Sequence, residues 1–207
     1  MAIELKWLGH SCFLVECEGY RILLDPFEPG SVPGCRDIQE VADQVLCSHE
    51  HHDHNYRAGA MLREDGPENP FTITPLASFH DDCQGQKRGP NTIHLLEAQG
   101  LRVAHMGDVG EMPAPEVLEQ LKGVDAVMLP VGGFYTVGPQ EAKAIADAVE
   151  AKVVIPMHYR SDSFGFDVLG PVEDYLNLDS HWMRYDTDTI EIHKNMHHSV
   201  AVLTYPS

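Results

Sequence analysis

Residues 48–54 have the sequence S-H-E-H-H-D-H, which places four histidines and two carboxylates in the six positions from His49 to His54. The apolar run Val45-Leu46-Cys47 comes directly before them, so we expect the segment where a strand ends and a loop or helix begins. Burying so many imidazoles and carboxylates together is unfavourable, because desolvation and like-charge repulsion both oppose it. A bound cation would remove that cost, and a solvated polar loop is the alternative interpretation.

The spacing within this segment follows the pattern H-x-H-x-D-H. Residues two apart in an extended segment project to the same side, so His49 and His51 can reach one metal ion. Asp53 and His54 can reach a second ion. Imidazole and carboxylate together form a ligand set that zinc and similar divalent metals accept. The pattern therefore predicts a site for divalent metal ions.

The hydrophobic pattern along the chain predicts an α/β fold. Apolar residues at helical spacing follow Pro139, and a second helical pattern covers 117–121. The predicted strands cover 3–15, 20–24, 71–79, 92–96, 101–106, 124–131 and 152–156, with a short helix at 58–62. A strand-rich start followed by alternating helices and strands predicts sheets between helical layers, and a length of 207 residues favours a single domain over 1–207.

Composition narrows the classes of partner. A formal net charge of -18 repels phosphate backbones and anionic lipid surfaces, so neither nucleic acid nor a membrane is an expected partner. The five cysteines lack CxxC spacing and indicate reduced thiols, and no signal peptide or membrane-spanning run is evident, so we expect a cytoplasmic protein. A small-molecule substrate is expected, and a homo-oligomer is left open.

Together these motifs resemble the metallo-β-lactamase superfamily, and more narrowly its short-chain branch similar to the ascorbate-6-phosphate lactonases and related metal-dependent hydrolases. Seven motifs in the expected order, spread over nearly the whole chain, carry the resemblance. They are W-L-G-H-S-C-F at 7–13, L-L-D-P at 23–26, S-H-E-H-H-D-H at 48–54, S-F-H-D-D at 78–82, H-M-G-D-V-G at 105–110, P-V-G-G at 130–133 and I-P-M-H-Y at 155–159. The resemblance implies an αβ/βα four-layer sandwich.

The resemblance also implies a ligand set for two divalent ions, with zinc expected first and manganese or iron as alternatives. The implied ligands are His49, His51 and His80 for the first ion, Asp53, His54 and His158 for the second, and Asp108 as a bridge between them. Asp25 would support the histidine segment without binding metal, as ligating histidines require such partners. Taken alone, His80, Asp108 and His158 also fit a surface histidine, a turn and a core histidine.

Other residues near the motifs have less defined roles. Asp53 would orient the attacking water, and Tyr159 could donate a hydrogen bond to a developing oxyanion. His10 and His105 could line the site or belong to the core. Lys87, Arg88 and Arg160 are the basic side chains near motifs that could meet a phosphate, whereas His197 and His198 should be exposed.

Two ions about 3.5–4 Å apart can activate a water and polarise the bond that it attacks, so the expected chemistry is hydrolysis. The predicted substrate is a small ester, lactone or phosphorylated compound. A phosphodiesterase or nucleic-acid-processing hydrolase of the same fold is the enzymatic alternative. A redox di-iron protein of this fold would carry Glu where this chain has His51, and a non-catalytic metal-binding protein is the remaining alternative.

Overall fold

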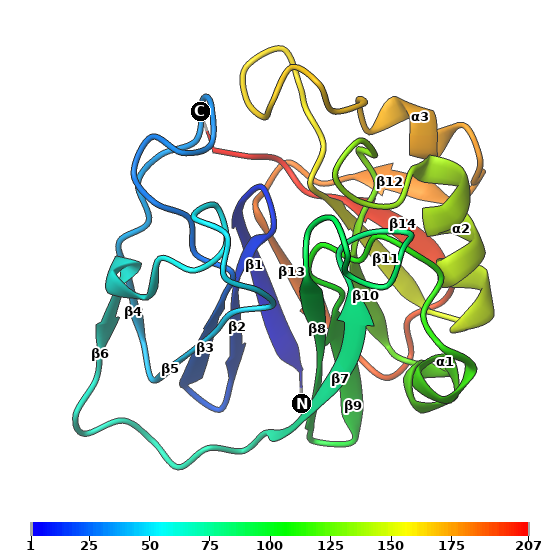
Figure 1. The fold of residues 1–207 in the computed structure, drawn as a ribbon. Coiled ribbons are helices and arrows are strands. Elements are labelled where there is room, and N and C mark those ends of the chain that lie inside the picture. The colour runs from blue at the N-terminus through cyan, green and yellow to red at the C-terminus, as the bar shows by residue number, and fades with distance from the viewer. Residues whose placement is uncertain (1, 207) are drawn as a thin grey trace.

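The computed structural model describes residues 2–206. Two β-sheets pack against each other, and three α-helices lie on the far side of the larger sheet (Figure 1). Apolar side chains from both sheets and from the helices join in one core, which includes Trp7, Phe13 and Ile93. The predicted α/β sandwich is confirmed.

The smaller sheet is built mainly from the first 46 residues. Its strand order is β13-β1-β2-β3-β5, with β13 returning from the C-terminal part of the chain. The strands are β1 (Ile3–Gly9), β2 (Cys12–Cys17), β3 (Tyr20–Leu24), β5 (Gln44–Leu46) and β13 (Thr189–Ile192). A turn at Glu18-Gly19 joins β2 to β3, where Cys17 pairs with Tyr20.

The predicted strand over 3–15 is wrong in one respect, because it is two strands. β1 ends at Gly9 and β2 begins at Cys12, so the chain reverses at His10-Ser11. His10 has a φ of 51°, in the left-handed region that side chains other than glycine seldom adopt. This turn places His10 at the end of β1.

The larger sheet has the strand order β12-β14-β11-β10-β9-β8-β7. Its strands are β7 (Thr72–Phe79), β8 (Pro90–Ala98), β9 (Leu101–His105), β10 (Ala126–Pro130), β11 (Val153–Met157), β12 (Trp182–Arg184) and β14 (Ser199–Val202). The strands β9, β10, β11, β14 and β12 are mutually parallel, and β10 and β11 are buried at every position. Burial on both faces is typical of parallel strands under helices.

The helices are α1 (Pro115–Leu121), α2 (Pro139–Ala148) and α3 (Glu173–Leu176). Both α1 and α2 begin with proline, whose fixed φ suits the first helical turn. Their buried residues include Val117, Leu121 and Ile145, as the helical spacing predicts.

The outer face of the smaller sheet is covered by loops and a small sheet instead of α-helices. A second apolar cluster there joins Cys12, Leu14 and Leu23 to Phe27, Val32, Ile38 and Ala42 of the long loop after β3. The small sheet pairs β4 (Glu40–Ala42) with β6 (Ala60–Leu62), after a 3₁₀ turn at Arg57–Gly59. The predicted helix over 58–62 is therefore wrong, because pairing with β4 outweighs the local helical pattern.

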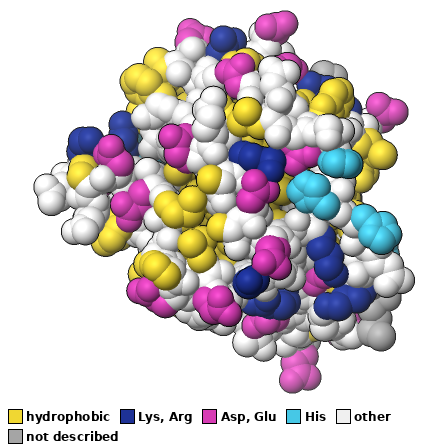
Figure 2. Space-filling view, turned by 90° about the vertical axis from the view of Figure 1, so that its right-hand side faces the viewer, with side chains coloured by type: hydrophobic (Ala, Val, Ile, Leu, Met, Phe, Trp, Pro, Cys, Tyr) yellow, Lys and Arg dark blue, Asp and Glu magenta, His cyan; other side chains and the backbone are white. Residues whose placement is uncertain are grey.

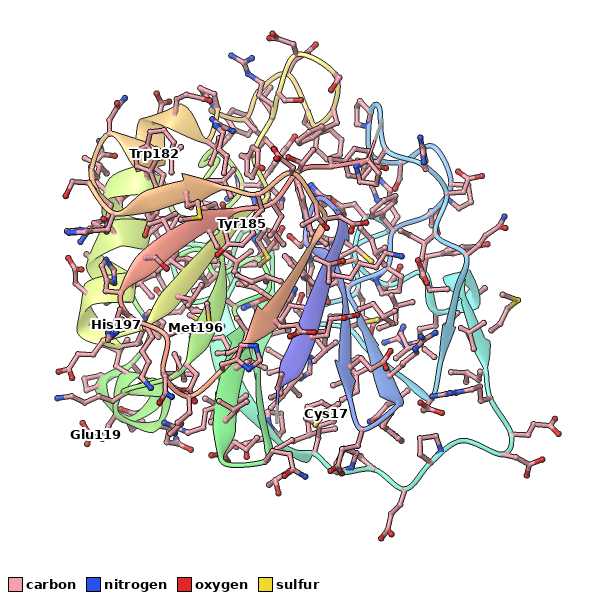
Figure 3. All side chains as sticks on the ribbon, turned by 180° about the vertical axis from the view of Figure 1, so that it is seen from behind. Cys17, Glu119, Trp182, Tyr185, Met196 and His197 are labelled. Carbon is pink, nitrogen blue, oxygen red and sulfur yellow. The ribbon has the colours of Figure 1, made fainter. Side chains whose placement is uncertain are left out.

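Surface features agree with several expectations. All five cysteines are free, and His197 and His198 are exposed; Figure 3 shows His197 at the surface before β14. On the face that carries the helices, Lys and Arg side chains alternate with Asp and Glu (Figure 2). None of the helices formed by residues 2–206 combines the length and hydropathy that a membrane crossing requires.

Candidate metal centre

The predicted ligands lie at the carboxyl ends of strands from both sheets. In the smaller sheet, β1, β3 and β5 point the same way, and the residues after them are His10, Asp25 and the segment from Cys47 to His54. In the larger sheet, β7, β9 and β11 share one direction, and His80, Asp108 and His158 follow them. The two sheets thus deliver ligand-type side chains to one edge from six strands.

Three imidazoles form the first group. Ligand atoms of His49, His51 and His80 all lie within 4.8 Å of one another. Their ring centroids are 4.6 Å apart for His49 and His51, and 4.7 Å apart for His49 and His80. His49 and His80 are buried, whereas His51 is exposed on the pocket side.

The second group contains the three predicted ligands and one more histidine. Ligand atoms of His10, Asp53, His54 and His158 lie within 4.8 Å of one another. His10 Nε2 is 3.4 Å from Asp53 Oδ2, and the His10 ring is 4.1 Å from that of His158. His10 therefore belongs to the site, an alternative that the sequence had left open.

Asp108 lies between the two groups. Its Oδ2 is 3.2 Å from His54 Nε2, 3.2 Å from His158 Nε2 and 3.4 Å from His80 Nε2. It therefore touches one histidine of the first group and two of the second. This is the position that the predicted bridging role requires.

The arrangement fits a metal better than it fits a set of hydrogen bonds. Nε2 atoms of His49, His54 and His158 are buried and have no hydrogen-bond partner among residues 2–206. Metal–ligand distances of about 2.0–2.2 Å place neighbouring ligand atoms about 3–3.5 Å apart, the spacing found around Asp108. Buried polar groups are normally satisfied, so these buried nitrogens fit the ligand set of a bound cation.

Asp25 orients two of the predicted ligands. It is fully buried, and its Oδ2 accepts hydrogen bonds from His54 Nδ1, at 2.9 Å, and from the Ser48 hydroxyl. The same hydroxyl oxygen lies 2.9 Å from His49 Nδ1 and can accept a hydrogen bond from its N–H. Both imidazoles therefore present Nε2 to the site. This is the supporting role predicted for Asp25.

The charges of the site are strongly coupled. Burial alone would raise the pKa of Asp108, but the His158 and His54 imidazoles hold it well below its usual range. Burial alone would lower the pKa of His54, but Asp108 and Asp25 hold it well above its usual value. Burial lowers the pKa of His49 to about 3. Metal binding requires deprotonated ligands, so a cation bound here would compete with protons for these imidazoles.

Two polar residues that the sequence did not single out build the loops around the ligands. Asn91 is buried; its Oδ1 accepts the Asp108 backbone N–H at 2.9 Å, and its Nδ2 donates to Ser78 Oγ and to the Met106 carbonyl. Asp81 accepts the backbone N–H groups of Cys83, Gly85, Lys87 and Arg88. The only sequence signal for Asp81 was its place beside His80, and Asn91 gave none.

His105 and Gly132 hold the backbone in place. The His105 ring is fully buried, with Nε2 2.8 Å from the Ser11 carbonyl and Nδ1 accepting the Gly107 N–H, so His105 ties the β1–β2 turn to β9 and does not line the site. Gly132 donates its N–H to the His158 carbonyl, and a Cβ there would lie 2.2 Å from that oxygen. Only glycine fits this approach.

Tyr159 is not brought to the reaction site. Its ring stacks on Trp7 at 5.5 Å and packs against Phe164 at 5.8 Å, and it lines a different pocket with Arg160. β11 ends at Met157 and His158 has a φ of 53°, so the chain turns here, with His158 in the site and Tyr159 packed among the aromatic side chains. The proposed oxyanion contact from Tyr159 has no geometric support, and Tyr135 is the tyrosine beside the ligands.

A pocket of about 290 Å³ opens onto the ligands. Four of its lining residues are predicted ligands: His51, Asp53, His80 and Asp108. The others are His52, Arg88, Tyr135 and Phe166. Catalytic metal sites keep an open position for water and substrate, whereas structural sites are closed. This centre is open on the pocket side.

Comparisons with known proteins point to one family. The model of the family described as β-lactamase superfamily domain matches residues 4–158. A UPF0173 metal-dependent hydrolase of Methanoculleus marisnigri is 31% identical over 189 residues, which cover 76% of this chain and 81% of that protein. A second, of Methanopyrus kandleri, is 28% identical over 193 residues, covering 76% of this chain and 84% of that protein.

A solved structure is similar over almost the whole length. It is a protein of Thermotoga maritima described as a candidate zinc-dependent hydrolase of the metallo-β-lactamase superfamily. The two chains are 34% identical with a TM-score of 0.78, and the match covers 97% of this chain and 98% of the other.

Proposed function

The chain belongs to the β-lactamase superfamily, and on that premise we propose that it is a hydrolase that uses two divalent metal ions to cleave a small-molecule substrate. One observation carries the proposal. Five histidines and two aspartates, delivered by both sheets, meet around Asp108 beneath an open pocket. Closed structural sites do not combine these features.

The imidazole-rich ligand set favours zinc, with manganese or iron as alternatives. When bound, the ions would supply an activated water and a Lewis acid for the bond under attack. His49, His51 and His80 would hold one ion, Asp53, His54 and His158 the other, with Asp108 between them.

Asp53 is the carboxylate that can orient the attacking water and accept a hydrogen bond from it. Its side chain is 17% exposed and lines the pocket, whereas Asp108 is 2% exposed and enclosed by imidazoles. Burial alone would raise the pKa of Asp53, but His10 and His54 hold it well below its usual range, so it is an anion that can accept a hydrogen bond from a water. His10 Nε2 lies 3.4 Å from Asp53 Oδ2.

The pocket favours a small substrate over nucleic acid. Its volume of about 290 Å³ lies at the lower end of small-molecule sites. Of the 14 Lys and Arg side chains, 11 are paired with carboxylates, so little positive charge is left for a phosphate backbone. His51 in place of Glu weighs against a di-iron redox centre.

The test is metal analysis followed by substrate profiling. Protein expressed with ample metal and purified without chelator should retain close to two ions per chain, and it should hydrolyse at least one member of a panel of lactones, thioesters, esters and phosphodiesters. Asp53→Ala and His158→Ala should abolish that activity. Clearly less than one ion per chain, or activity unchanged in both variants, would reject the proposed centre; two ions without turnover would favour a metal-binding protein.

A further inference from the structure

Arg88 stands out among the basic side chains of this protein. Among residues 2–206, only Arg36, Arg88 and Arg160 have no carboxylate oxygen within 4.0 Å of their side-chain nitrogens. These three of the eight arginines have no acidic partner although the chain has 32 acidic residues. Arg88 is also the one of the three that lines the metal pocket.

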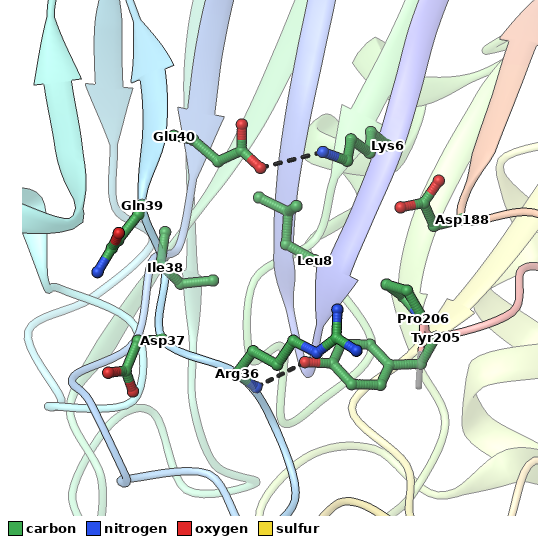
Figure 4. Close-up of a pocket in the computed structure, with 10 residues that line it drawn as sticks. All are labelled: Lys6, Leu8, Arg36, Asp37, Ile38, Gln39, Glu40, Asp188, Tyr205 and Pro206. Carbon is green, nitrogen blue, oxygen red and sulfur yellow. Dashed lines mark hydrogen bonds and ion pairs between the residues drawn. The ribbon is translucent and has the colours of Figure 1, made fainter.

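The other two unpaired arginines lie elsewhere. Arg36 lines a separate pocket beside Tyr205, on the side of β1 where Lys6 pairs with Glu40 (Figure 4). Arg160 donates from Nε to the Leu169 carbonyl and lines the pocket that contains Tyr159. Lys87, the third basic residue predicted near the motifs, pairs with Asp82 at 2.9 Å on the surface.

The Arg88 guanidinium is held in place without being neutralised. Its backbone N–H donates to Asp81 Oδ2 at 2.8 Å, which fixes the loop that carries it. Its guanidinium carbon lies 5.6 Å from the centre of the Tyr135 ring, and Nη2 donates to the Phe134 carbonyl at 3.3 Å. These contacts use one of the five N–H donors of arginine and leave the others available for an anion.

The remaining wall of the pocket is aromatic. The rings of Tyr135 and Phe166 lie 6.3 Å apart, and Phe166 reaches His10 at 5.5 Å. A ligand with its reacting bond at the metal ligands would therefore pass an apolar wall and meet Arg88. Arginine recognises carboxylate and phosphate through paired hydrogen bonds.

We propose that Arg88 is the specificity-determining residue of this pocket, and that the substrate is a small ester or lactone carrying a separate carboxylate or phosphate group. This inference rests on the proposed metal-dependent hydrolysis, because it places the reacting bond at the metal ligands. Arg88 binds the anionic group away from that bond, Tyr135 and Phe166 contact the apolar part, and no group of Arg88 takes part in the reaction.

Binding measurements test the proposal without requiring turnover. Hydroxamates bind divalent metals, so the monohydroxamates of malonic, succinic and glutaric acid place a carboxylate at three distances from the metal. Titration calorimetry on the metal-loaded protein compares each compound with two analogues. In one, a methyl amide replaces the carboxylate and removes the charge; in the other, a phosphonate replaces it. The phosphonate series separates a phosphate substrate from a carboxylate substrate.

For at least one of the three acids, the wild type should bind the anionic compound about 10–100-fold more tightly than its methyl amide, as expected for a charge-assisted contact. Arg88→Ala should reduce that preference to less than about twofold and leave the methyl amide affinity unchanged, and Arg88→Lys should retain part of it. Arg36→Ala, which removes an unpaired arginine from another pocket, should keep the preference intact.

The outcomes that overturn this proposal are distinguishable from a failure of the metal centre. Hydroxamates that bind equally with and without the anionic group, or a preference that survives in Arg88→Ala, would remove Arg88 from substrate recognition while leaving the metal centre intact. If none of the hydroxamates binds to metal-loaded wild type, the proposed recognition by Arg88 fails while the metal centre stands. If the wild type cannot be loaded with divalent metal at all, the metal centre is absent and both proposals fail.

Discussion

The two sheets hold their share of the metal centre by different means. In the smaller sheet, the ligand rings themselves are hydrogen-bonded from behind: Asp25 orients His54 directly and His49 through Ser48. In the larger sheet, Nδ1 of His80 and Nδ1 of His158 have no hydrogen-bond partner among residues 2–206.

In the larger sheet, hydrogen bonds of the backbone position the ligands. The N–H of His80 donates to the Gly89 carbonyl, that of His158 donates to the His10 carbonyl, and that of Asp108 donates to Asn91. The smaller sheet therefore orients side chains, and the larger sheet orients the backbone from which side chains project. Metal affinity should consequently be more sensitive to outer hydrogen bonds in the smaller sheet.

The largest effect is expected at Asp108, where the two sides meet. Asp108→Ala removes the carboxylate that lies within 3.4 Å of His54, His80 and His158. We expect bound metal to fall to one ion or fewer per chain and activity to fall by about 10³-fold or more, beyond the roughly 10–100-fold effect of an outer partner. Metal analysis and steady-state kinetics measure both, and retention of two ions would show that the two groups do not depend on a shared bridge.

The next largest effect is expected at His10, which contacts Asp53 from the smaller sheet and His158 from the larger sheet. Burial, together with His158, lowers the pKa of His10 to about 4, against about 6.5 in an unfolded chain. As pH falls below 6.5, the unfolded chain takes up this proton first, so the stabilisation is complete above pH 6.5 and is lost as pH falls towards 4. The loss is up to about 3 kcal/mol, of which about 2 should appear by pH 5.

Denaturant unfolding of metal-free protein at pH 7 and pH 5 measures this difference. The wild type should lose about 2 kcal/mol more than His10→Gln between the two pH values, since glutamine does not titrate. An equal loss in both proteins would mean that His10 is already protonated in the fold and pairs with Asp53 as a cation.

The segment from His49 to His54 shows how far the sequence could predict the site. Residue type and spacing predict the four ligands that lie close together in the chain, because a strand end presents alternate residues to one side. The distant ligands, such as His80 and Asp108, were predicted only through resemblance. Their approach depends on which strands become neighbours, and single side chains carry no signal of that.

The elements that were missed have the same explanation. No strand was predicted after residue 159, yet β14 lies between β11 and β12 and β13 completes the smaller sheet. These strands have only three or four residues each, too few for a clear alternation. Asn91 and Tyr135 likewise acquire their roles from segments that are distant in sequence.

The third prediction tests the difference between the sheets directly. Asp25→Asn keeps the shape of the side chain but weakens its hold on His54 and Ser48, so we expect metal affinity to fall about 10–100-fold. Competition with a chelator of known affinity measures it. Asp43→Asn is the matched control. Asp43 directly precedes β5 and also accepts hydrogen bonds, from Arg21 and Arg63, but it lies outside the site. Equal affinity loss in both variants would indicate general destabilisation.

The smallest effect is expected at Tyr159. Its ring belongs to an aromatic group with Trp7 and Phe164, and burial raises the pKa of its hydroxyl well above the usual value, so the group is neutral and turned away from the ligands. Tyr159→Phe should therefore leave kcat and KM within about twofold of wild type, because only an oxygen outside the pocket is lost. A tenfold loss of kcat with unchanged KM and melting temperature would mean that β11 can present either His158 or Tyr159 to the site, and that backbone positioning by the larger sheet is looser than its hydrogen bonds imply.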